Sequence, residues 1–220
     1  MRRLLVVLGV LLALVVAASP AQAAGNAFHF SVKGPGAEAF WSTFPTQGDP
    51  QPGVVYTDTY LQTAAQAVRE DGTRFDDKFL FIDQFSYKFD RRGNFIFVSE
   101  TFGFASGNDV NLTVDARRLT TASVTATVAL TTCTEEHGEF VCVDAGTATV
   151  HAAWTGTGEL LRVSDTFRVT SKTFTEVSRF RGTFRDATAT GGLNGTDFGT
   201  SQFADIFNAS SADLFVCHGC

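Results

Sequence analysis

Apolar and polar residues alternate at every second position through much of this chain, and this pattern constrains the fold more than any other feature. It recurs in residues 28–30, 79–81, 95–97, 124–130 and 147–154. Alternation with period 2 places one side of a strand in a core and the other toward water. The composition of 22 Phe and a single Met, with many Thr and Val, also favours strands.

Turn residues separate the alternating runs. Residues 70–73 and 90–94 have hairpin-like sequences in which Gly supplies a positive φ. Residues 106–109 and the pair Gly191-Gly192 predict further interruptions, and the Pro-rich segment 44–53 predicts a loop. The spacing predicts an all-β fold, an antiparallel β-sandwich or closed β-barrel of about ten to twelve strands.

Single positions within the runs carry further expectations. Residues 61–68 have a weak helical periodicity, and we interpret them as the end of a strand. Trp154 shares a face with Val150 and Ala152 and is expected in the core, whereas His151 falls on the opposite, solvent-facing side. Trp41 is either a core residue or an exposed ring on which a sugar stacks.

The first 23 residues predict a secretory signal. Arg2 and Arg3 precede an apolar run, Leu4–Ala18, and Ala21-Gln22-Ala23 supplies small residues for cleavage after Ala23. A retained anchor is the alternative, but the run is shorter than the ~20 residues that span a bilayer as a helix. We therefore expect a secreted, extracellular chain in which residues 24–220 form a single β-domain without a later membrane span.

The charge balance excludes one class of partner. The chain has a formal net charge of −6, with 17 basic and 23 acidic residues. Without Arg2 and Arg3, 15 basic residues stand against 23 acidic ones, a formal charge of −8. A nucleic-acid partner is not expected, because phosphate neutralisation needs an excess of Lys and Arg.

Four cysteines, an even number in an exported chain, predict disulfides. Cys133 and Cys142 flank a hairpin loop, and Cys217 and Cys220 lie at the end of the chain. We predict the pairs Cys133–Cys142 and Cys217–Cys220, and the two crossed connectivities remain alternatives. A redox pair, a zinc site and a haem attachment are less favoured, because the spacing or the order of residues differs from those motifs.

The sequence predicts no catalytic residue, no metal site and no cofactor. The four histidines are scattered, and no Gly-x-Ser-x-Gly motif is present. Two carboxylates at a suitable separation would serve a glycosidase, but a chain this rich in acids offers many arbitrary pairs. The acids in question include Asp58, Asp71, Asp76, Asp77, Asp83, Asp90 and Glu100.

A basic stripe is the least random polar feature. Arg179, Arg181 and Arg185 fall on one face of a predicted strand, with Phe180 and Phe184 on the other, toward the core. Same-face neighbours lie ~6.7 Å apart on a strand, so an extended anionic ligand such as a cell-wall polymer or acidic glycan would reach several. An ordinary solvated face is the favoured interpretation of the stripe, because exposed antiparallel faces are ordinarily charged. Its balancing acids would be Glu159, Asp165, Glu176 and Asp186.

Two segments carry a family resemblance. Residues 152–158 (AAWTGTG) and 182–191 (GTFRDATATG) resemble segments of a group of exported β-rich proteins from high-GC Gram-positive bacteria. The likeness covers these two segments well and the rest of the mature chain loosely. It implies export and a β-fold, and it assigns no catalytic residue.

Two functions are consistent with these observations. The favoured one is a non-catalytic binding or structural module of the cell exterior or wall. The alternative is a secreted hydrolase or isomerase whose site lies in the mouth of a β-barrel, because barrels can hold a ligand there. The sequence leaves the oligomeric state open.

Overall fold

A computed structural model describes residues 27–172 and 174–218, and 77% of the chain is in strands. The predicted signal segment, residues 1–23, lies outside the described residues. All strands pair antiparallel, as expected, and the eleven strands belong to one sheet. The elements are β1 (Ala27–Ser42), β2 (Val55–Glu70), β3 (Thr73–Phe89), β4 (Phe95–Ser106), the 3-10 turn η2 (Gly107–Asp109), β5 (Val110–Val114), β6 (Thr121–Glu136), β7 (Glu139–Gly156), β8 (Leu161–Thr170), β9 (Phe174–Leu193), β10 (Thr196–Asp197) and β11 (Phe203–His218).

Eight of the strands close into a ring, which we call the barrel although it is not evenly barrel-shaped. Its order is β1-β2-β3-β4-β6-β7-β9-β11, and β11 pairs back to β1. The closing contact joins residues 150–156 of β7 to residues 187–193 of β9. The short strands β5 and β10 pair with β6 and β9 outside the ring.

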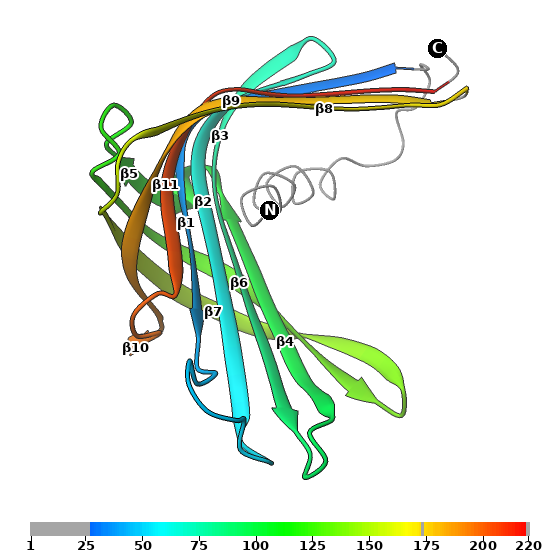
Figure 1. The fold of residues 1–220 in the computed structure, drawn as a ribbon, viewed down its shortest axis with the longest axis vertical. Helices are drawn as coiled ribbons and strands as arrows, with labels where there is room; N and C mark the ends of the chain where they lie inside the picture. Colours follow the sequence, from blue (N-terminus) through cyan, green and yellow to red (C-terminus); the bar gives the residue numbers. More distant parts are fainter. Residues whose placement is uncertain (1–26, 173, 219–220) are drawn as a thin grey trace.

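Six strands extend beyond the barrel as one layer, which we call the arm. In Figure 1, β8, β9, β11 and the start of β1 run together across the top of the molecule, at a steep angle to the strands below. The strand order in the arm is β8-β9-β11-β1-β2-β3. It comprises β8 and residues 27–35 of β1, 65–70 of β2, 73–78 of β3, 174–183 of β9 and 209–218 of β11.

The barrel interior is packed with apolar side chains, many of them alanines. Trp41, Leu61, Ile82 and Trp154 are at most 2% exposed and form part of this core. An eight-stranded ring has room for little more than its own side chains, which explains the small residues. The alternating Phe79 and Phe81 do not enter this core. They share a face with Gln62 and Ala64, whereas Leu80 and Ile82 point into the barrel.

The turns follow the expected chemistry with one exception. Asp71 and Gly72 have φ values of 43° and 92°, as the predicted hairpin turn requires. The prediction for Gly191-Gly192 was wrong, because both lie inside β9 and the turn falls at Asn194-Gly195. A Cβ on Gly192 would lie 2.7 Å from the carbonyl oxygen of Thr196, so this glycine permits a close strand approach.

A hydrogen bond across the barrel ties two strands that are far apart in sequence. The indole N–H of Trp154 in β7 donates to the carbonyl oxygen of Glu38 in β1, at 2.8 Å. Trp154 is 1% exposed, as predicted, and Trp41 is also buried, which favours its core interpretation. The indole N–H of Trp41 has no hydrogen-bond partner among the described residues.

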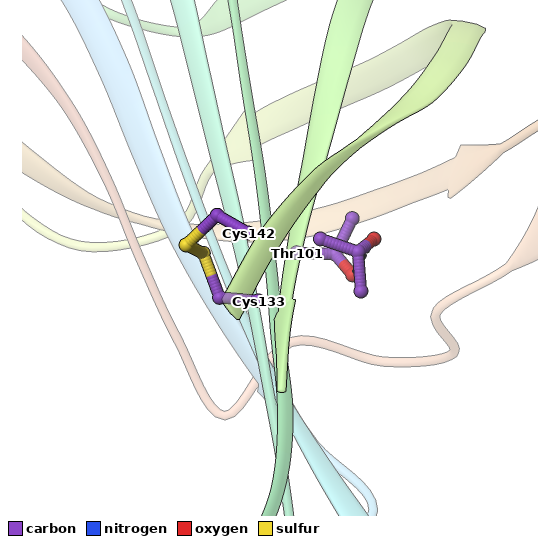
Figure 2. Close-up of a disulfide and its surroundings, with 4 residues drawn as sticks. Thr101, Cys133 and Cys142 are labelled. Atoms are coloured by element: carbon purple, nitrogen blue, oxygen red, sulfur yellow. Dashed lines mark hydrogen bonds between the residues drawn. A yellow bond between two sulfur atoms is a disulfide. The ribbon is translucent and has the colours of Figure 1, made fainter. Parts of the chain in front are cut away.

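The hairpin of β6 and β7 carries the predicted disulfide. Cys133 and Cys142 are opposite each other in the ladder, with Cα atoms 4.0 Å apart, and their sulfurs are bonded. Figure 2 shows the bridge beside Thr101 of β4, whose hydroxyl is hydrogen-bonded to that of Thr132. Cys217 is buried in β11, and its predicted partner Cys220 lies outside the described residues.

Replacing Trp154 with Phe tests the hydrogen bond across the barrel. The change leaves the carbonyl of Glu38 without its buried donor, which costs about 1–3 kcal/mol beyond the loss of ring area. Trp41→Phe is the matched control, because it removes a similar area but no hydrogen bond. Urea denaturation should show Trp154→Phe as the less stable variant; equal losses would contradict the role of the bond.

Removing the disulfide with Cys133→Ser and Cys142→Ser together should lower the free energy of unfolding. The chain-entropy model assigns about 2–3 kcal/mol to a loop of this length. Urea denaturation with and without reductant measures the effect, and the double variant should respond less to reductant than the original chain. An identical response of both chains would contradict the prediction.

Candidate functional site: a basic and an acidic face on one layer

The three predicted arginines share a face of β9, but one of them has an internal role. Arg179 and Arg181 are exposed in the arm. Arg185 is half-buried near the barrel, where its Nε donates to the carbonyl of Gly158 at 2.8 Å and its Nη1 to that of Arg118 at 3.0 Å. On the opposite face Phe180 is buried, as expected. Two of the three guanidinium groups are therefore exposed for a ligand.

The structure extends this stripe over the whole arm. Cross-strand neighbours form a continuous row through Arg179, Asp213, Ser31, Arg69 and Arg74, from β9 to β3. Arg162 and Arg168 of β8 fall on the same face. We call this surface the basic face, and all of its basic residues are exposed. They are Lys33, Arg69, Arg74, Lys78, Arg162, Arg168, Arg179 and Arg181.

Sequence reasoning missed this extension because the basic residues are dispersed over five strands. The acids expected to balance the arginines lie elsewhere. The register places Asp165, Glu176 and Asp186 on the opposite face of the sheet, and Glu159 falls in the loop before β8. Within the arm, Asp76 and Asp213 are the acids that share the basic face. The expected neutralisation within the stripe is therefore wrong.

One contact on the basic face is unfavourable in isolation. Arg69 and Arg74 are directly opposite each other across the β2–β3 pair. Like charges at directly opposed positions destabilise a sheet, and an anion between them would relieve that repulsion. Side chains on this face lie ~6.7 Å apart along a strand and ~4.8 Å apart between neighbouring strands. This array suits a polymer with repeating anionic groups.

The other face of the same strands is aromatic and acidic, and we call it the aromatic face. One cross-strand row contains Phe203, Phe40, Tyr60, Asp83 and Phe102. The next row contains Asp186, Asp205, Glu38, Gln62, Phe81 and Phe104. A third contains Leu161, Phe184, Phe207, Gly36, Ala64, Phe79 and Ser106.

A buried carboxyl group lies at the centre of the aromatic face. Glu38 is fully buried, and its Oε2 accepts a hydrogen bond from the hydroxyl of Tyr60 at 2.8 Å. Burial raises the pKa of Glu38 to about 7, although the bond from Tyr60 opposes the shift. Burial also raises the pKa of Asp83 to about 6, and the neighbouring charge of Glu100 adds to this.

Groups that titrate near neutral pH can act as general acids or bases, but the Glu38 side chain is fully buried and does not reach solvent. One pocket of about 370 Å³ is open to solvent and is lined by residues of β2, β3 and η2, including Gln66 and Asp77. Its lining includes neither Glu38 nor Asp83. Sequence inspection named Asp83 and Glu100 only among many acids, and it missed Glu38, because burial of a strand face depends on distant strands.

Glu38→Gln should change how stability depends on pH. Because the pKa of Glu38 is raised from 4.5 to about 7 on folding, its stabilising effect is complete below pH ~4.5 and is lost as the pH rises through ~7. The variant lacks this loss and keeps an acceptor for Tyr60. Urea denaturation at pH 5 and pH 8 should show it more stable than the original chain at pH 8, by about 2–3 kcal/mol.

Glu135→Gln is the control for that measurement, because it removes an exposed carboxyl group of the same charge. It should leave the pH dependence unchanged. A Glu38→Gln variant with the pH dependence of the original chain would contradict the assignment.

Three observations complete the description. Within residues 27–172 and 174–218, no group of three or more His, Cys, Asp or Glu side chains is arranged to hold a metal ion. The same part of the chain has no helix of the length and hydropathy needed to span a membrane. Comparison of the chain with protein-family models, with curated proteins and with solved structures finds no match.

Proposed function

We infer that the chain is a binding module of the cell exterior that attaches to an anionic polymer through the basic face. The observation that carries this function is the collection of exposed Lys and Arg from five strands on one side of the arm. Although the chain has a net charge of −6, the basic residues are gathered on one face of these strands and most of the acids lie on the other. A uniformly solvated surface has no such separation of charge.

The ligand class follows from the shape of the basic face. Its residues form an open array rather than an enclosed pocket, so an extended polymer with repeated carboxylate, phosphate or sulfate groups fits better than a small ion. Guanidinium groups bind such anions with two parallel hydrogen bonds. A cell-wall polymer or an acidic glycan has this chemistry.

Two features support an extracellular role without catalysis. The Cys133–Cys142 disulfide is typical of oxidising compartments and agrees with the predicted signal segment. The packed barrel interior favours binding over the alternative of a hydrolase or isomerase with a site in the barrel mouth, because such a site needs an open cavity.

Replacing Arg179 and Arg181 with Ser should weaken binding to an anionic polymer. Heparin is a suitable probe, with uncharged dextran for comparison, and affinity should fall about tenfold, or ~1.4 kcal/mol. Binding by the original chain should also weaken as salt is raised, because exposed charges are screened.

Arg91→Ser with Arg92→Ser is the matched control. It changes the net charge equally at an exposed turn outside the arm, so it should retain nearly all the affinity. Equal losses of affinity in the two double variants would show that binding depends on net charge alone. That result would overturn the basic face as the binding site.

A further inference from the structure

The basic face is hollowed where it ends on β2 and β3. The open pocket of about 370 Å³ is lined there by residues 65–67 of β2, by residues 76–78 of β3, and by Gly107 and Asn108 of η2. Its volume falls within the ~300–1,000 Å³ that is usual for ligand pockets. The arm therefore combines an open array of charges with one concave position.

Strand register shows on which side of the sheet the pocket opens. Ala65 lies opposite Lys78 across the β2–β3 pair, and Ala67 lies opposite Asp76. Alternate residues of a strand point to the same side, so Ala65 and Ala67 share the basic face with Arg69, and their partners on β3 share it too. The residue between each pair points to the opposite side and meets the pocket through its backbone. The pocket therefore opens on the basic face.

The pocket has a small apolar floor and polar walls. Ala65 and Ala67 form the floor, while Asp76, Lys78 and Asn108 supply a carboxylate, an ammonium group and an amide. These three polar side chains are exposed. Within residues 27–172 and 174–218, none of the three forms an ion pair or a side-chain hydrogen bond. Their hydrogen-bonding groups are therefore available to a ligand.

The surroundings of the pocket are mostly positive. Lys33 of β1 lies opposite Ala67. Arg69 and Arg74 follow two residues along their strands from Ala67 and Asp76, a distance of ~6.7 Å. An anionic chain held by the basic face is thus brought to the pocket. There the carboxylate of Asp76, which only accepts hydrogen bonds when ionised, requires a donor from the ligand.

This set of groups matches a sugar ring that carries a carboxylate. The ammonium group of Lys78 binds the carboxylate with charge-assisted hydrogen bonds. Asp76 accepts hydrogen bonds from ring hydroxyls, and the amide of Asn108 both donates and accepts. A phosphate polymer without hydroxyls offers no donor to Asp76 and places its own negative charge beside that carboxylate, where like charges repel.

Two simpler occupants fit the pocket less well. A divalent cation such as Ca²⁺ takes six to eight oxygen ligands, but the side chains of the two acids in the lining, Asp76 and Asp77, point to opposite sides of the sheet. A lone inorganic anion would be attracted to Lys78, but it would leave most of the 370 Å³ unfilled and would have no use for Asp76.

We propose that the pocket holds one sugar ring of an acidic glycan whose sugar units carry carboxylates. Lys78 binds the carboxylate, Asp76 and Asn108 bind the ring hydroxyls, and the alanine floor packs against the apolar side of the ring. This inference rests on the proposed function. It narrows the ligand of the basic face from anionic polymers in general to acidic glycans.

The experiment compares two polymers of similar charge, a short oligogalacturonate and a short polyphosphate. Isothermal titration calorimetry with the mature chain measures both affinities. Asp76→Ala with Asn108→Ala should lower the affinity for oligogalacturonate about tenfold, because the ring hydroxyls lose their partners. The affinity for polyphosphate should not fall, because the variant removes a negative charge and no positive one.

A second variant tests the shape of the pocket rather than its polar groups. Ala67→Leu fills the pocket from its floor without changing a charge, so it should weaken the binding of oligogalacturonate and leave that of polyphosphate unchanged. Asp49→Ala with Asn111→Ala is the matched control for the polar variant, since both residues are exposed and lie outside the pocket. It should lower neither affinity. Circular dichroism checks that each variant keeps the fold.

The outcomes separate this inference from the proposed function. Arg179→Ser with Arg181→Ser should weaken the binding of both polymers, because these arginines contact either one. If the original chain binds both polymers and the pocket variants lose affinity for neither, or equally for both, the pocket does not hold a sugar and the basic face stands. Binding of polyphosphate alone would also overturn the sugar. If the chain binds neither polymer, the proposed function itself fails.

Discussion

The division of strand β9 between two neighbours is the constraint on which the rest of the structure depends. Its residues 187–193 pair with β7 and close the barrel, whereas its residues 175–184 pair with β8 on that same edge. The first half of β9 therefore leaves the ring and extends with its neighbours as the arm. A closed barrel conceals the inner face of each strand, whereas in the arm that same face is exposed as the basic face. The basic face follows from this division.

Local shifts in strand pairing keep each face chemically uniform where the arm joins the barrel. In β11 an extra residue between Ala209 and Ser211 shifts the register against both β1 and β9. As a result Phe207 and Ala212 share a face although their spacing is odd. A similar shift opposite Ser86 and Tyr87 keeps Phe97 on the face of Phe102. Without these bulges, a one-residue slip would move every following side chain to the wrong face.

The sorting of charge gives the arm two surfaces of opposite sign. Arg179 and Arg181 occupy one side of β9, while Glu176 and Asp186 occupy the other. The exposed Lys and Arg side chains of the basic side can hold an anionic polymer, whereas the other side of the arm is buried at Phe30, Phe180 and Leu214. Burial of Glu38 beside Tyr60 gives the acidic side an uncompensated buried carboxyl group, which the basic side lacks.

Much of the local structure could be predicted from residues close in sequence. Alternation with period 2 identified the strands, Asp71-Gly72 identified a hairpin, and the position of Cys133 and Cys142 across a short loop identified their bridge. The alternation also predicted that His151 and Trp154 face opposite ways, which the structure confirms. These properties depend on backbone geometry within one strand or one hairpin, so a single sequence contains them.

The tertiary structure decided which face meets which environment. The pattern 79–82 separates Phe79 and Phe81 from Leu80 and Ile82, but only the closed ring makes the second pair the barrel core. The three predicted arginines were correctly assigned to one strand face. These arginines share a surface with Arg69 and Arg74, and the acids expected to balance them lie on the other face. Both results depend on pairing between strands more than 100 residues apart in the chain. By itself the sequence determined which residues lie on the same side of a strand, because that follows from the pleat. Which sides assemble into one surface was decided by strand register and ring closure, because these depend on contacts that a local pattern does not contain.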